Sequence, residues 1–147
     1  MYYSISEISK MFNLPISTLR YYDSNGLFPN LKRESGIRKF SDNEIETLRV
    51  IECLKKSGLE IKEIKLFMEW CKEGPSSYQK RLDLITKQKE HVENEIARMN
   101  KALDMLKFKT WYYKTLIQNG DENKIKEMIP NNLPNDIKEA YKNSHQD

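Results

Sequence analysis

Residue types that are able to bind nucleic acids are concentrated near the start of the chain. Residues 1–41 hold six Lys and Arg against three Asp and Glu, and they include four tyrosines. Hydroxyl groups can donate to phosphates, and a guanidinium group can bind guanine or a phosphate through two hydrogen bonds. Both kinds of donor occur in the run 15–23, and we predict that it contacts DNA through Ser17, Thr18, Arg20, Tyr21 and Tyr22.

Two short helices joined by a tight turn are predicted to position this run. Ser4 and Glu7 have the spacing of a capping box, which favours a helix over about 5–12. Proline is tolerated in the first turn of a helix, so Pro15 favours a second helix over about 15–24. Such a pair forms a helix-turn-helix, whose second helix enters the major groove. The alternative is that Tyr21 and Tyr22 are core residues whose hydroxyl groups reach the solvent.

A second basic group follows at residues 32–40. Gly36 separates two short extended runs, which is typical of a β-hairpin. Such a hairpin would be a wing whose basic side chains contact the DNA backbone, adding affinity and salt dependence but little sequence choice. The alternative is an ordinary solvated turn. The wing residues that we assign to DNA binding are Lys32, Arg33, Arg38, Lys39 and Phe40.

Two further helices are predicted before the first strong break in the chain. Ser41 and Glu44 have capping-box spacing and favour a helix over about 42–56. Its apolar residues fall on more than one face, which indicates a central, well-buried helix. A fourth helix follows over about 61–72. The Gly-Pro pair at 74–75 then ends it and marks the main domain boundary.

A long helix is predicted over 76–110, where the sequence has no Gly or Pro. Apolar residues recur there in alternating steps of four and three, which is a heptad seam. Such a helix is about 50 Å long at 1.5 Å per residue, too long for the core of this chain to cover. We therefore predict that it pairs with a second copy; the alternative is a helix lying along its own domain. The predicted dimerisation residues are Leu82, Ile85, Val92, Ile96, Met99, Leu103 and Leu106.

The chain is predicted to consist of three parts: a DNA-binding domain at 1–75, a dimerisation helix at 76–110 and a short helical tail at 111–147. Charged residues make up 32% of the sequence and the net charge is +3. This composition and the lack of a long apolar run argue against a membrane protein. No signal peptide is recognisable, and two cysteines fit a reducing cytosol, so we expect a cytoplasmic protein.

The sequence gives almost no support for an enzyme. Cys53 and Cys71 have none of the usual zinc spacings, and His91 and His145 are far apart without a partner pattern. No glycine-rich phosphate loop and no hydrolase or metalloprotease motif is present. We therefore expect no catalytic residues, no metal and no cofactor.

The first half of the chain resembles the DNA-binding domain of the MerR family of transcriptional regulators. The matching motifs are ISEISK at 5–10, TLRYYD at 18–23, GLF at 26–28, GIRKF at 36–40 and SGLEIKEI at 57–64. The family often has tyrosine at the positions of Ile37 and Phe40. The resemblance extends over about 1–75, and to the long helix by architecture.

The resemblance implies a mainly α fold, in which a winged helix-turn-helix is followed by an antiparallel coiled coil that dimerises the protein. It also implies a second wing near 59–63, with Lys62 as a DNA contact. Such dimers bind pseudo-palindromic operators between the −35 and −10 promoter elements. They bend and untwist the DNA so that RNA polymerase engages both elements. The alternative functions are an architectural DNA-binding protein without promoter activation and a coiled-coil interaction protein.

An effector is suggested only by analogy. One branch of the family responds to aldehydes or thiol stress through a cysteine in the third helix, and Cys53 resembles that position. The alternative is that Cys53 is a small buried apolar residue. Cys71 falls on the predicted core face of its helix, and we interpret it as structural. Trp111, Tyr112 and Tyr113 would pack against the DNA-binding domain of the partner or line a small-molecule pocket between protomers.

Overall fold

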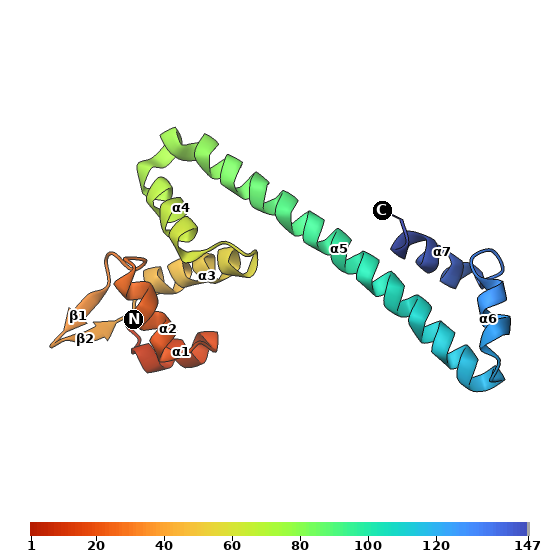
Figure 1. Cartoon of the computed structure of the whole chain (residues 1–147). Coiled ribbons are helices and arrows are strands. Elements are labelled where there is room, and N and C mark those ends of the chain that lie inside the picture. The colour runs from red at the N-terminus through yellow and green to blue at the C-terminus, as the bar shows by residue number, and fades with distance from the viewer. Residues whose placement is uncertain (147) are drawn as a thin grey trace. The chain divides into compact units, whose positions relative to one another are not determined.

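The computed structural model describes residues 1–146 and divides the chain into two compact units, Met1–Glu90 and His91–Asp147. Helices dominate both units, and the sheet has only two strands (Figure 1). This architecture confirms the predicted fold class, a winged helix-turn-helix followed by a long helix. Each unit is considered by itself below.

The helix-turn-helix consists of α1 (Ile5–Phe12) and α2 (Ile16–Ser24). The predicted capping box of α1 is present: Glu7 N–H donates to Ser4 Oγ over 3.1 Å, and Ser4 N–H donates to a Glu7 carboxylate oxygen over 3.2 Å. The helix ends at Asn13, whose φ of 52° is left-handed. Pro15 is the N-cap residue of α2 rather than its first helical residue. The tight turn between the helices is therefore formed by three residues, 13–15.

The wing is the hairpin of β1 (Lys32–Glu34) and β2 (Ile37–Lys39), which pair antiparallel with Arg33 opposite Arg38. Ser35 and Gly36 form its two-residue turn with φ of 51° and 77°. Positive φ at both positions is what a type I′ turn requires, and glycine adopts it without strain. An isolated bridge between Tyr3 and Phe40 ties the base of the wing to the N-terminus.

Two longer helices complete the N-terminal unit, α3 (Asp42–Lys56) and α4 (Ile61–Glu73), and a 3₁₀ turn, η1 (Gly74–Ser77), follows them. The capping box of α3 is present, with Ser41 N–H donating to Glu44 over 2.8 Å. The prediction of a well-buried α3 was wrong. Val50 and Cys53 are exposed, because only one face of the helix packs on its neighbours.

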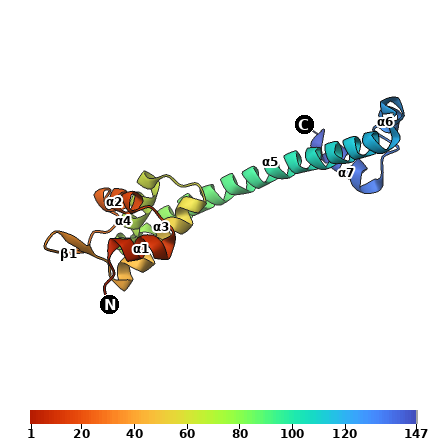
Figure 2. The same ribbon diagram turned by 90° about the horizontal axis from the view of Figure 1, so that it is seen from below.

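The hydrophobic core of the N-terminal unit draws on every helix from α1 to α4 and on both ends of the wing. These elements lie around one another in both views (Figures 1 and 2). Phe28 and Phe40 meet edge to face with ring centroids 5.6 Å apart. The core residues are Ile8, Leu19, Tyr22, Leu27, Phe28, Phe40, Ile45, Leu48, Ile51, Leu59 and Ile64.

The helix α5 (Tyr78–Asn119) is 42 residues long and continues without interruption past the predicted end of the coiled coil at 110. Among the seven predicted dimerisation residues, Val92 is half-buried and the other six are exposed. The alternative, in which this helix lies along its own domain, would have buried them.

The C-terminal unit is completed by α6 (Glu122–Met128) and α7 (Asn135–Ser144), both within the predicted helical tail. The chain turns back so that α7 runs beside the last part of α5 (Figures 1 and 2). Phe108 of α5 is buried there, and its ring lies 4.9 Å from that of Tyr141. Among the described residues, no helix combines the length and hydropathy needed to span a bilayer.

Candidate nucleic-acid interface

The outward face of α2 carries four of the five side chains that the run 15–23 was predicted to present to DNA. Ser17, Arg20 and Tyr21 are exposed, and Thr18 is half-buried. Helical spacing turns Leu19 inward to anchor the helix on the core. Arg20 makes no ion pair or hydrogen bond within residues 1–146, so its guanidinium is available to a ligand. No side chain caps the N-terminus of α2; the Thr18 amide donates to the Pro15 carbonyl over 3.0 Å, and the amides of Ile16 and Ser17 have no hydrogen bond within residues 1–146.

Tyr22 does not belong to this face, and its assignment as a DNA contact is corrected. Its side chain is fully buried, because it lies three residues after Leu19 on the same inward side of α2. The hydroxyl donates to Glu52 Oε1 over 2.8 Å and accepts from Lys55 Nζ over 2.9 Å. Burial raises the pKa of this hydroxyl, and the hydrogen bond with it raises the pKa of Lys55. Tyr22 therefore fixes α2 to α3.

The wing is anchored to α2 through Asp23. The Nε–H of Arg38 donates to Asp23 Oδ2 over 2.8 Å, and Arg33 pairs with the same oxygen. The Asp23 side chain is only 9% exposed, so the two arginines neutralise a nearly buried carboxylate. Each guanidinium retains N–H groups that do not face Asp23. Arg33 and Arg38 thus orient the wing and still have donors for a phosphate.

The other wing residues differ in exposure. Lys32 is exposed and donates to the Tyr2 hydroxyl over 2.9 Å, a hydrogen bond that raises the pKa of this lysine. Lys39 lies 3.9 Å from a Glu34 carboxylate oxygen, a loose surface pair. Phe40 is buried against Phe28, and its assignment as a DNA contact is corrected, because its ring fills the core beneath the wing.

The predicted second wing corresponds to the start of α4. Lys62 is exposed in the first turn of this helix, beside a capping interaction in which Glu60 N–H donates to Glu63 Oε1 over 3.3 Å. Lys62 is thus accessible to a phosphate, whereas Glu60 and Glu63 add negative charge at the same helix end.

Both cysteines are exposed and free. The interpretation of Cys71 as a core residue was wrong, because it lies in the last full turn of α4, where no neighbouring element covers it. The exposure of Cys53 removes the alternative that it is a small buried apolar residue. Within residues 1–146, no group of three or more His, Cys, Asp or Glu is arranged to hold a metal ion.

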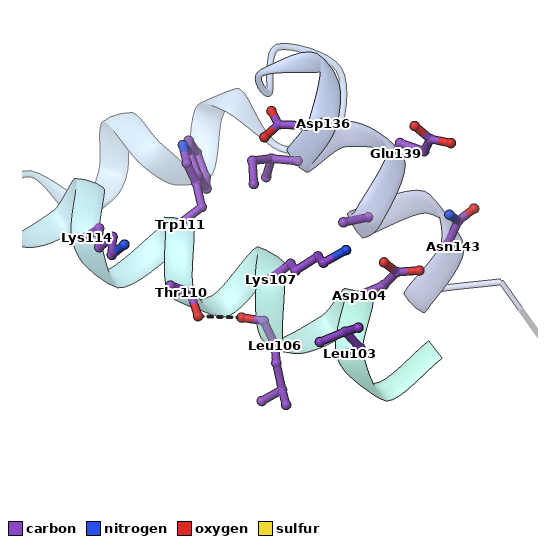
Figure 3. A pocket seen from close by; sticks show the side chains of 12 residues that line it. Leu103, Asp104, Leu106, Lys107, Thr110, Trp111, Lys114, Asp136, Glu139 and Asn143 are labelled. Carbon is purple, nitrogen blue, oxygen red and sulfur yellow. Dashed lines mark hydrogen bonds between the residues drawn. The ribbon is translucent and has the colours of Figure 1, made fainter. Parts of the chain in front are cut away.

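The C-terminal unit contains a cleft of about 740 Å³ between α5 and α7. Figure 3 shows Lys107 and Trp111 reaching from α5 toward α7, while Leu106 points away from it. The neighbouring Tyr112 donates a hydrogen bond from its hydroxyl to Glu122 over 2.7 Å. This hydrogen bond raises the pKa of Tyr112 to about 12. The remaining lining residues are Leu103, Asp104, Thr110, Lys114, Asp136, Ile137, Glu139, Ala140 and Asn143.

Sequence reasoning missed Asp23, although a signal for it existed. Asp23 is the one acidic residue between Glu7 and Glu34, in a segment otherwise rich in basic residues. A lone carboxylate among arginines is a natural anchor for them. The structure adds that this anchor joins the helix to the wing, which spacing alone does not indicate.

Comparison with known proteins agrees with the geometry of this interface. The family model described as MerR HTH family regulatory protein matches residues 3–70. An uncharacterized HTH-type transcriptional regulator of Haemophilus influenzae is 35% identical over 114 residues, which span 77% of this chain and 84% of the relative. The HTH-type transcriptional regulator AdhR of Bacillus subtilis is 30% identical over 90 residues, 60% of this chain and 64% of the relative.

Solved structures are similar over most of their length. A crystal structure of HiNmlR, a MerR family regulator lacking the sensor domain and bound to promoter DNA, has a TM-score of 0.70 and 32% identity. The match covers 84% of this chain and 99% of that one. A MerR family regulator from Bacillus thuringiensis has a TM-score of 0.63 and 40% identity, with 75% and 97% covered. The chain therefore belongs to the MerR family and is a DNA-binding transcriptional regulator, not an enzyme.

Proposed function

We propose that two copies of this protein bind a pseudo-palindromic operator in the spacer of a promoter and activate transcription by bending and untwisting the DNA. The exposed face of α2, with the unpaired Arg20 at its centre, is the observation that carries this proposal. The DNA-bound HiNmlR structure supports it, because that relative is similar over nearly its whole length. The activity would take place in the cytoplasm, where bacterial promoters and RNA polymerase are found.

The proposed contacts fall into two groups. Ser17, Thr18, Arg20 and Tyr21 would lie in the major groove, where Arg20 can read a guanine with two hydrogen bonds. The basic residues outside α2 would contact phosphates of the flanking backbone and contribute affinity rather than sequence choice. They are Lys32, Arg33, Arg38, Lys39 and Lys62.

In the proposed mechanism a symmetric dimer bends the DNA. Bending a site of this size costs several kcal/mol, which must be offset by backbone contacts from both ends of the operator. The exposed apolar residues of α5 supply the surface through which two copies can associate. The wing anchored by Asp23 gives each copy a rigid unit that transmits force to the DNA.

Footprinting of the purified protein on its own upstream region tests this function. Protection between the −35 and −10 elements is the expected result, with hypersensitive bases at the centre of the site in the activating state. Protection without any central distortion would favour the architectural DNA-binding alternative. Absence of protection at promoter sites would favour the coiled-coil interaction alternative and contradict the proposal.

We propose Cys53 as the site at which an electrophilic effector acts. Its thiol is exposed on α3 between Glu52 and Leu54, and Glu52 accepts the hydrogen bond from Tyr22 of α2. Modification of Cys53 would therefore take place next to a contact that fixes the recognition helix.

The Cys53→Ser variant is expected to lose the promoter response to a thiol-reactive aldehyde while retaining operator binding. The matched control is Cys71→Ser, which removes the other exposed thiol and should leave the response intact. A promoter reporter assay measures both. A full response in the Cys53→Ser variant would exclude this residue as the sensor.

A further inference from the structure

Three side chains on the first turns of α5 lie against the rest of the N-terminal unit. Arg81, Leu84 and Gln88 follow one another at intervals of three and four residues, which places them on one side of the helix. All three are half-buried, whereas the other residues from 82 to 90 are exposed. Leu84 packs against the hydrophobic core. The polar side chains before and after it contact the two ends of α4.

Arg81 holds the C-terminal end of α4. Its Nε–H donates to Ser77 Oγ over 2.9 Å, and its Nη2 donates to the carbonyls of Trp70 and Gly74 over 3.0 Å each. The last carbonyls of a helix have no partner within the helix, and the helix dipole favours a cation beside them. Ser77 is fully buried, so it holds the guanidinium in place. Arg81 therefore fixes this end of α4 to α5.

Gln88 holds the turn that precedes α4, at its opposite end. The side-chain amide of Gln88 donates to the carbonyl of Ser57. No backbone N–H within residues 1–146 donates to that carbonyl, so Gln88 supplies a hydrogen bond that the turn itself lacks. The approach is close, because a Cβ atom at Gly58 would lie 3.0 Å from Gln88 Nε2. Glycine at this position, where φ is 96°, leaves room for the amide of Gln88.

Lys62 lies on the segment that these two contacts hold. It is exposed in the first turn of α4, directly after the turn that contains Ser57. In the proposed function its ammonium group contacts a DNA phosphate. Such a charge-assisted hydrogen bond requires its two heavy atoms to be within about 3 Å. A displacement of the start of α4 would therefore weaken it.

We propose that Gln88 is a positioning residue for the DNA contact of Lys62. By holding the Ser57 carbonyl, Gln88 fixes the start of α4, while Arg81 fixes its end. The second wing is thus positioned by the long helix as well as by the core beneath it. This inference rests on the proposed function, in which Lys62 binds a phosphate. The recognition helix α2 is fixed separately, through the hydrogen bonds of Tyr22 with α3.

A double-mutant cycle on DNA binding tests this role. Gln88→Met keeps the length of the side chain and removes its N–H donor, and Lys62→Ala removes the proposed phosphate contact. The matched control is Gln79→Met, because Gln79 is an exposed residue of α5 whose side chain donates to Asp83 of the same helix. The full-length variants are titrated, at several salt concentrations, with a duplex of the upstream region of the protein's own gene and with duplexes that carry base substitutions.

The salt dependence of binding is expected to report the loss of one phosphate contact. Lys62→Ala should reduce the magnitude of the slope of log K against log salt by about 0.9 for each bound copy of the chain. Gln88→Met should reduce it by about half of this amount or more and weaken binding about threefold or more. Added to Lys62→Ala, it should change neither quantity further. Gln88→Met should retain discrimination among the substituted duplexes, and Gln79→Met should bind as the wild type does.

Four results would contradict this account, and they are distinguishable. Equal effects of Gln88→Met with and without the Lys62 side chain would show that Gln88 acts independently of it and overturn the proposal. An unchanged slope in Gln88→Met, beside a reduced slope in Lys62→Ala, would overturn the positioning role and leave the phosphate contact in place. Loss of base discrimination in Gln88→Met would show a general structural effect instead. An unchanged slope in Lys62→Ala would overturn the phosphate contact itself, and the positioning role with it.

Discussion

The N-terminal unit buries its apolar residues, whereas the helix α5 leaves most of its apolar residues exposed. The first buries residues from four helices and the wing in one core, and it exposes polar and basic side chains on α2 and the wing. The second leaves most of an apolar seam in solvent over 42 residues of helix. The N-terminal unit therefore buries its core within a single copy, whereas the apolar residues of α5 would be covered only in the proposed dimer.

A similar contrast separates the arginines of the N-terminal unit. Arg20 is exposed and has no partner within residues 1–146, whereas Arg33 and Arg38 share Asp23. Free donors are suited to reading bases, and donors held by a carboxylate are suited to fixing a wing in place. In the proposed function, the same residue type would serve recognition at Arg20, whereas at Arg33 and Arg38 it orients the wing.

The largest effect is expected at the seam. The Ile96→Glu substitution places a charge where the proposed dimer buries an apolar side chain, and each dimer contains two copies of it. We expect the dimer dissociation constant to rise by at least about 100-fold, or roughly 2.7 kcal/mol, measured by sedimentation equilibrium. Asn94→Glu adds the same charge to the opposite side of α5 and should leave the constant unchanged. An unchanged constant in the Ile96→Glu variant would show that the seam does not mediate dimerisation.

A smaller effect is expected at the anchor of the wing. Asp23→Ala removes the shared partner of Arg33 and Arg38, and we expect the free energy of unfolding to fall by about 1–2 kcal/mol. Glu34→Ala is the matched control, because its carboxylate is 77% exposed and meets Lys39 only at 3.9 Å. Glu34→Ala should lower the free energy of unfolding by less than about 0.5 kcal/mol. Equal effects of the two substitutions in urea unfolding would contradict the anchoring role.

The smallest effect is expected in the pH dependence of the stability of the C-terminal unit. The hydrogen bond to Glu122 raises the pKa of Tyr112 to about 12 in the folded state, above the ordinary value of 10.0. Between pH 10 and about 12 the folded chain holds this proton and the unfolded chain releases it, so the stabilisation decreases as pH rises. Tyr112→Phe should remove this part of the pH dependence of thermal unfolding, and Tyr113→Phe should keep it. The same profile in both variants would exclude Tyr112 as its source.

Local patterns in the sequence were enough to predict most elements of the fold. The capping boxes at Ser4 and Ser41 and the hairpin around Gly36 lie where the sequence predicted them, because each depends on residues a few positions apart. The pairing of Phe108 with Tyr141 depends on residues far apart in the chain, and no local pattern indicates it. Packing of the C-terminal helices was for that reason not predictable.

The sequence predicted the recognition helix of the candidate interface but not which of its two adjacent tyrosines is buried. Tyr21 and Tyr22 are adjacent and chemically identical, but a helix turns successive side chains by about 100°, so one is exposed and the other buried. The three-residue step from Leu19 to Tyr22 would have indicated which one faces the core.

The central claim is that the free guanidinium of Arg20 reads the operator, and operator binding by Arg20→Ala tests it most directly. Arg98→Ala is the matched control, since Arg98 pairs with Glu95 within the C-terminal unit. We predict that Arg20→Ala loses about 1–3 kcal/mol of operator affinity in a titration at fixed salt, while Arg98→Ala binds as the wild type does. An Arg20→Ala affinity within about 0.5 kcal/mol of the wild type would contradict the assignment of α2 as the recognition helix.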